Sequence, residues 1–125
     1  MSEVRVTEEH AWLRLEDDGS VTVGITGYAQ EQLGDIVFIE LPQVGQTVSS
    51  GDEAAVIESV KAAGDVSVPV SGTVLEINDK LADAPELVNS DPLGDGWFFR
   101  LEVEDTSELQ GLMSEDDYRE FIAGL

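Results

Sequence analysis

The chain has 125 residues, and its 27 aspartates and glutamates against 6 lysines and arginines give a formal net charge of −21. Such a charge argues against nucleic acid as a partner, because phosphate backbones are bound by clustered lysine and arginine. The chain has no cysteine and a single histidine, His10. This excludes disulfides, thiolate metal sites and multi-histidine metal sites built from one chain.

Hydrophobic residues make up 42% of the sequence, which is enough for a core, and the length fits one domain over residues 1–125. Acidic chains can be disordered, but apolar periodicity runs through most of this one. Repulsion among so many acids is largely screened in molar salt. A folded, lysine-poor, acidic chain therefore favours a halophile with a salty cytoplasm, and an acidic mesophilic protein is the alternative.

The N-terminus has no basic segment followed by an apolar stretch, and no apolar run approaches the roughly 18 residues of a membrane span. These observations lead us to expect a cytoplasmic protein with no membrane partner.

The first half of the chain predicts short strands separated by turns rich in glycine and aspartate. Thr26 is expected to cap a short helix over residues 27–33, and Gly34 to end it. Residues 36–41 form an almost continuous apolar run, which predicts a buried strand. The strands expected in this half are 4–6, 11–15, 21–25, 36–41 and 54–60, and turns at Gly45 and Gly51 are expected on either side of 46–48.

The second half opens with residues 65–70, whose valines alternate strictly on one face. Pro69 lies within that run and predicts an edge strand or a bulge. Strands are expected over 73–77 and 97–103, separated by a polar loop over 79–92 with room for a short helix at 85–88. Two further helices are expected over 107–113 and 115–123. Lys80 and Arg100 are expected to face solvent, and the acids at 115–117 to begin a helix.

The many short strands indicate a mainly β protein, a small sandwich or barrel with added short helices, including C-terminal ones. Lys61, one of only two lysines, lies between two strand-like segments where a hairpin should turn. A type I turn over 60–63, with Gly64 in a left-handed conformation, would place Lys61 at the tip. A lysine amine is protonated at neutral pH, so its acylation needs an enzyme that binds the hairpin. The plainer interpretation is an ordinary surface lysine.

The run Glu58-Ser59-Val60-Lys61-Ala62 resembles the lipoyl-lysine signature of the glycine cleavage system H proteins. The resemblance extends over nearly the full chain. The other matching segments are Val23-Gly24-Ile25-Thr26, Ala29-Gln30, Leu33-Gly34-Asp35, Val37-Phe38, Glu40-Leu41-Pro42, Asp65-Val66, Pro69-Val70-Ser71-Gly72, Leu87-Val88-Asn89 and Gly96-Trp97.

This resemblance implies a lipoyl-domain-like flattened barrel or sandwich of two small antiparallel sheets. It implies that (R)-lipoate is amide-linked to Lys61 by a lipoate-attaching enzyme. It further implies a carrier, not an enzyme, that shuttles the aminomethyl group of glycine from glycine decarboxylase (P-protein) to aminomethyltransferase (T-protein). Dihydrolipoamide dehydrogenase (L-protein) would then reoxidise the arm. We expect a monomer.

One segment departs from the family. H proteins commonly carry His-Glu-Trp near the N-terminus, where the glutamate lines a cleft that shelters the loaded arm, and this chain has His10-Ala11-Trp12. Asp65 matches another cleft-lining position, and Glu9 is a candidate replacement for the missing acid. For His10 and Trp12 the alternative is simple packing. Glu58 is either part of a charged turn or a recognition element for the attaching enzyme, and Ala62 belongs to the same motif.

Other functions remain open at this stage. A lipoyl domain of a 2-oxo acid dehydrogenase usually has Asp-Lys-Ala and is shorter, and biotin carriers usually flank their lysine with methionines, where this chain has Val60 and Ala62. A protein that relays lipoyl groups to other enzymes would look the same. No motif supports a hydrolase built on paired carboxylates, since 27 acids produce many pairs by chance.

Overall fold

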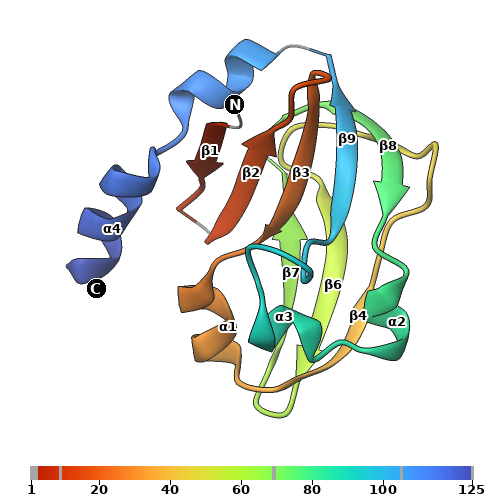
Figure 1. Cartoon of the computed structure of the whole chain (residues 1–125), viewed down its shortest axis with the longest axis vertical. Helices are drawn as coiled ribbons and strands as arrows, with labels where there is room; N and C mark the ends of the chain where they lie inside the picture. Colours follow the sequence, from red (N-terminus) through yellow and green to blue (C-terminus); the bar gives the residue numbers. More distant parts are fainter. Residues whose placement is uncertain (1–2, 9, 69, 105, 125) are drawn as a thin grey trace.

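A computed structural model describes residues 3–8, 10–68, 70–104 and 106–124. Two antiparallel sheets face each other (Figure 1). One has the strand order β1-β2-β3-β9-β8-β5 and the other β4-β6-β7. The strands are β1 (Glu3–Val6), β2 (Ala11–Leu15), β3 (Ser20–Ile25), β4 (Ile36–Glu40), β5 (Thr47–Val48), β6 (Glu53–Ser59), β7 (Ala63–Ser67), β8 (Gly72–Ile77) and β9 (Phe99–Val103).

Short helices surround the sheets. They are α1 (Gly27–Leu33), α2 (Lys80–Asp83), α3 (Leu87–Ser90), the 3₁₀ helix η1 (Thr106–Gly111) and α4 (Glu115–Ala123). α1 begins as expected, because the Thr26 hydroxyl accepts a hydrogen bond from the Ala29 N–H at 3.2 Å. In the part of the chain that is described, no helix is both long and apolar enough to cross a membrane.

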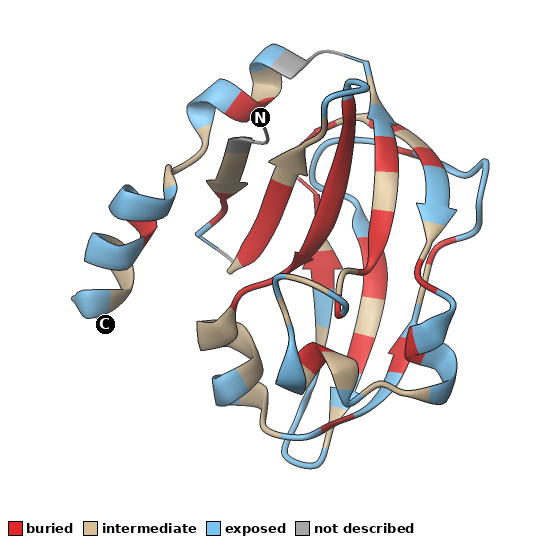
Figure 2. Ribbon diagram, viewed as in Figure 1, coloured by how far each residue is buried: buried red, intermediate tan, exposed pale blue. Residues whose placement is uncertain are grey.

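The main core lies between the sheets. Val21 and Leu101 of the six-stranded sheet and Ile57 and Val66 of the three-stranded sheet are buried in one cluster. In β9, buried residues alternate with more exposed ones from Phe99 to Glu102, whereas β3 is buried along its whole length (Figure 2). The two sheets do not join into one in the described residues. The expectation of a mainly β fold with two antiparallel sheets and short added helices is therefore confirmed, and the sheets do not close into a barrel in the described residues.

A second, smaller cluster attaches the C-terminal helix to the six-stranded sheet. Val6, Trp12 and Tyr118 are buried in it. Trp12 lies opposite Gly24, and a Cβ at Gly24 would come within 2.6 Å of the indole ring. Glycine is therefore required there by the close approach of Trp12.

Three local predictions differ from the structure. Residues 80–83, expected as loop, form α2, so Lys80 is exposed on a helix. The short helix expected over 107–113 is a 3₁₀ helix over Thr106–Gly111, so it ends two residues earlier than expected. The strand expected over 65–70 ends at Ser67, although Val66, Val68 and Val70 are buried as their alternation predicted. Pro69, on which the bulge prediction rested, lies outside the described residues.

The run 36–41 was expected to be a buried strand, and this is wrong for three of its members. Ile36 and Ile39 are buried, but Val37 is 54% exposed, Phe38 is 49% exposed, and Glu40 is exposed as well. The register between β4 and β6 shifts between Ile36 and Phe38. An extra residue in one strand breaks the alternation of faces, which an apolar run does not reveal.

Candidate functional site: the Lys61 hairpin

The hairpin formed by β6 and β7 carries Lys61 in its connecting turn. Glu58 pairs with Ala63 as the last rung of the ladder, so residues 59–62 form the loop. Lys61 and Ala62 are exposed, and Glu58 is exposed on the adjoining rung. Figure 1 shows this loop at the end of the molecule where α1 and α3 lie, away from the N-terminus.

Ser59 closes the turn. Its N–H donates to the Ala62 carbonyl at 2.8 Å, and its hydroxyl accepts the N–H groups of Lys61 at 3.2 Å and Ala62 at 3.0 Å. A Ser hydroxyl that binds nearby backbone groups stabilises such turns. Gly64 has no positive φ and pairs with Ile57 within the ladder, so the expected left-handed glycine is wrong. The turn is therefore stabilised by the hydrogen bonds of the Ser59 side chain and not by a left-handed glycine.

The turn rests on the segment that joins α1 to β4. The Val60 N–H donates to the Asp35 carbonyl at 3.0 Å. The aliphatic stem of Lys61 crosses Gly34, where an added Cβ would lie 3.1 Å from the lysine Cε. Gly34 has φ of 79°, a conformation that favours glycine. The helix stop at Gly34 therefore also provides the surface on which the lysine stem lies.

Asn89 of α3 holds that joining segment in place. Its Oδ1 accepts the Ile36 N–H at 2.8 Å, and its Nδ2 donates to the Gly34 carbonyl at 2.9 Å and to Gln30 Oε1 at 2.8 Å. One side chain thus fixes the end of α1 and the start of β4 on either side of Asp35. In the sequence Asn89 stood out only as part of a family-like segment, because its partners are more than 50 residues away.

Asp65 lies farther down the hairpin than the other predicted site residues. Asp65 belongs to β7, pairs with Val56 of β6 and is exposed. The Glu53 carboxyl shares a hydrogen bond with Asp65, which together with the negative charge of Asp65 raises the pKa of Glu53 above its ordinary value. Two carboxylates therefore lie together on the hairpin, and the sequence singled out only one of them.

His10 and Ala11 take part in packing. Ala11 is buried in the main core. His10, with φ of 71°, places Nδ1 2.7 Å from the Tyr118 hydroxyl, which lies 2.8 Å from the Thr26 hydroxyl. Burial lowers the pKa of His10 below its ordinary value. Glu9, the candidate replacement for the missing acid, lies outside the described residues.

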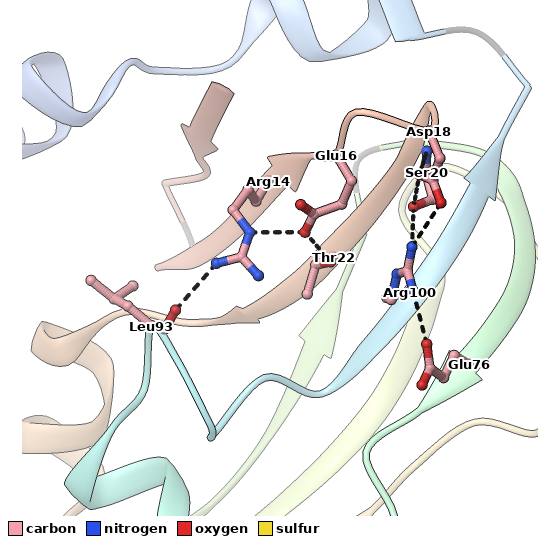
Figure 3. Close-up of polar contacts among 8 residues, drawn as sticks. All are labelled: Arg14, Glu16, Asp18, Ser20, Thr22, Glu76, Leu93 and Arg100. Atoms are coloured by element: carbon pink, nitrogen blue, oxygen red, sulfur yellow. Dashed lines mark hydrogen bonds and ion pairs between the residues drawn. The ribbon is translucent and has the colours of Figure 1, made fainter. Parts of the chain in front are cut away.

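A second group of polar side chains lies on the outer face of the six-stranded sheet (Figure 3). Arg14, Thr22, Arg100 and Glu76 form one row across β2, β3, β9 and β8. Arg14 binds Glu16 at 2.8 Å, and Arg100 binds Glu76 at 2.9 Å and Asp18 at 3.0 Å. Arg100 is therefore ion-paired and partly buried, more so than the sequence predicted.

These contacts lower the pKa values of Glu16 and Asp18. Partial burial raises the pKa of Glu16, but hydrogen bonds from Thr22 and Arg14 and the charge of Arg14 outweigh it, so the net shift is downward. Hydrogen bonds from the Ser20 hydroxyl and N–H lower the pKa of Asp18. A cavity of about 390 Å³ lies between the two arginines, but both guanidinium groups already bind carboxylates. We interpret this group as a stabilising network.

Among the described residues, no three His, Asp or Glu side chains converge to hold a metal ion.

Comparison with known proteins gives a consistent picture. The family model described as "Glycine cleavage H-protein" matches residues 4–124. Glycine cleavage system H proteins of Marinobacter nauticus and Escherichia coli are each 54% identical, over 98% and 97% of this chain and 94% of each relative. That of Rhodospirillum rubrum is 52% identical over the whole chain and 99% of the relative. The crystal structure of an H protein from Mycobacterium marinum superimposes with a TM-score of 0.87 at 35% identity, covering 98% of both chains.

Proposed function

Because the chain belongs to the glycine cleavage H-protein family, we propose that it is the lipoyl carrier of a glycine cleavage system and that Lys61 bears the lipoyl group. The observation that carries this assignment is the exposed position of Lys61 in the β6–β7 turn. Lys80 lies on α2, outside any hairpin turn. The carrier would pass the aminomethyl group of glycine from the P-protein to the T-protein and be reoxidised by the L-protein.

The residues around Lys61 suit an amide-linked arm. When bound, the lipoyl group supplies the sulfur chemistry that accepts and releases the aminomethyl group. The protein chain itself positions the lysine to which the arm is attached. Ser59 holds the turn, and Gly34 and Asp35 support the lysine stem and the adjoining backbone. A rigid base of this kind limits the volume through which the arm moves and leaves its outer end free to visit several enzymes.

Asp65 and Glu53 are the residues we propose to hold a cationic amine at the outer end of the arm. Both belong to the hairpin, and the hydrogen bond with Asp65, together with repulsion by the negative charge of Asp65, raises the pKa of Glu53. A cation between them would relieve that repulsion. We propose Glu58 and Ala62 as parts of the surface that the lipoate-attaching enzyme recognises, since both flank Lys61 and are exposed.

For its setting, we propose a monomer in a cytoplasm of high ionic strength. The net charge of −21 supports the high ionic strength, because molar salt screens the repulsion among the acids of one chain.

Reconstitution tests the proposed function. Lipoylated protein should let the P-protein release carbon dioxide from glycine, whereas the Lys61→Arg variant treated in the same way should not. The carrier alone should release none. Equal activity with the Lys61→Arg variant would overturn the assignment of Lys61, and turnover by the carrier alone would overturn its class.

A further inference from the structure

The bulge in β4 creates an apolar surface beside the Lys61 turn. Ile36 pairs with Ser59 and Phe38 with Glu58, so two steps along β4 match one step along β6. Val37 and Phe38 are consequently both turned outward, at 54% and 49% exposure. Val60, next to Lys61, is 65% exposed. We call Val37, Phe38 and Val60 the tip patch.

The tip patch is continuous with the lysine turn. Phe38 lies opposite Glu58, the rung that closes the hairpin loop. The Asp35 carbonyl, two residues before Val37, accepts the Val60 N–H at 3.0 Å. Six large apolar side chains are exposed in the described part of the chain, and three of them form this patch. Single exposed apolar residues are ordinary, but a group of them beside a modified residue indicates an interface.

The partner can be inferred from how close each enzyme must come to the Lys61 turn. An enzyme that acylates Lys61 must bring Nζ itself into its active site, so it must cover everything within one lysine side chain of the turn. Enzymes that act on the finished arm meet its outer end, which extends farther by the length of the acyl chain. The attaching enzyme is therefore the partner that has to approach the tip patch most closely.

The charges around the tip patch indicate the chemistry of the surface that would bind it. Asp35, Glu40 and Glu58, which border the tip patch, are all exposed acids. An interface commonly has an apolar centre and a polar rim. The complementary surface is thus an apolar recess bordered by lysine or arginine side chains.

We propose that the tip patch is the docking surface for the enzyme that attaches lipoate to Lys61. This inference rests on the proposed function. In the attachment step Nζ, having lost a proton to a base of the enzyme, forms a bond to the carboxyl carbon of a lipoyl adenylate. The bond from that carbon to the phosphate oxygen breaks, and AMP leaves. The tip patch holds the hairpin while Nζ reaches the adenylate.

Steady-state lipoylation kinetics test the proposal. The apo protein would be titrated against a lipoate-attaching enzyme supplied with lipoate and ATP. Val37→Thr keeps a β-branched side chain on the strand, Phe38→Thr introduces another residue type that is common in strands, and both remove exposed apolar surface. Each should raise the KM for the apo protein about tenfold with little change in kcat, as expected for loss of a contact at an interface centre. Val44→Thr and Leu75→Thr are matched controls, exposed by 61% and 43% away from the patch. Both should leave the KM unchanged.

A second measurement separates this partner from others. Each variant would be lipoylated to completion and then assayed with the P-, T- and L-proteins, whose kcat/KM values should stay within about twofold of wild type. Unchanged attachment kinetics in the two patch variants would overturn the proposal. So would an equal rise in the KM of the controls, an equal loss in the later steps, or a wild-type dimer that Phe38→Thr dissociates. Failure of the proposed function looks different, because the wild-type chain would then not be acylated at Lys61 at all.

Discussion

Replacing Asn89 with alanine should loosen the base on which the lysine turn rests. The substitution removes three hydrogen bonds, to Ile36, Gly34 and Gln30. At about 0.5–1.5 kcal/mol each, their loss should lower the free energy of unfolding by roughly 1.5–4.5 kcal/mol. Because Asn89 is only half-buried and water can replace part of the loss, we expect about 2–3 kcal/mol.

The assay is equilibrium unfolding in urea, with amide hydrogen exchange read at Ile36 and Val60. The exchange of both amides should accelerate, since one binds Asn89 directly and the other binds the adjoining Asp35 carbonyl. Ser90→Ala on the same helix is the matched control. Its hydroxyl makes one exposed contact of 3.4 Å, so its effect should stay within about 0.5 kcal/mol. An Asn89→Ala variant as stable as the control, with unchanged exchange at Val60, would refute the reasoning.

The remaining predictions concern charge. Raising KCl from about 0.1 M to 1 M shortens the screening length from about 10 Å to 3 Å, so the thermal midpoint should rise, and a flat response would remove the argument for a salty cytoplasm. The lowered pKa of His10 means that the unfolded chain takes up the proton first, so stability from His10 is present above about pH 6.5 and is lost below it. His10→Asn, which tolerates a positive φ, should therefore flatten the fall in thermal midpoint between about pH 7.5 and 5, and parallel curves would contradict this. Asp65→Asn should accelerate the release of ammonia and formaldehyde from loaded carrier, and equal rates would show that Asp65 does not hold the amine.

Local patterns predicted much of the fold. The Thr26 cap, the stop at Gly34 and the start of α4 lay close to where the sequence placed them, because each depends on residues within one turn. The β4 bulge was missed, because it depends on pairing with β6 and leaves no mark on an apolar run. The contact between His10 and Tyr118 joins residues 108 apart, and no periodicity in the sequence could reveal it.

The site likewise combines features that depend on neighbouring residues with features that depend on contacts between distant segments. Lys61 and its neighbours formed a recognisable run in the sequence. Asn89, Gly34 and Glu53 reach the site through tertiary contacts or cross-strand pairing, so only the structure indicates their roles. Gly64 illustrates the reverse error. Glycine is a residue type that is common in turns, but the pairing of β6 with β7 continues through Gly64, and Ser59 closes the turn.

The central claim, that Lys61 is the lipoylated residue, is tested most directly by intact mass and peptide mapping. Wild type, Lys61→Arg and Lys80→Arg would each be treated with the attaching enzyme, lipoate and ATP. We predict a mass increase of one lipoyl amide on wild type and on Lys80→Arg, mapped to the peptide containing Lys61, and none on Lys61→Arg with its thermal midpoint unchanged. A lipoyl amide found on the Lys61→Arg variant would contradict the account.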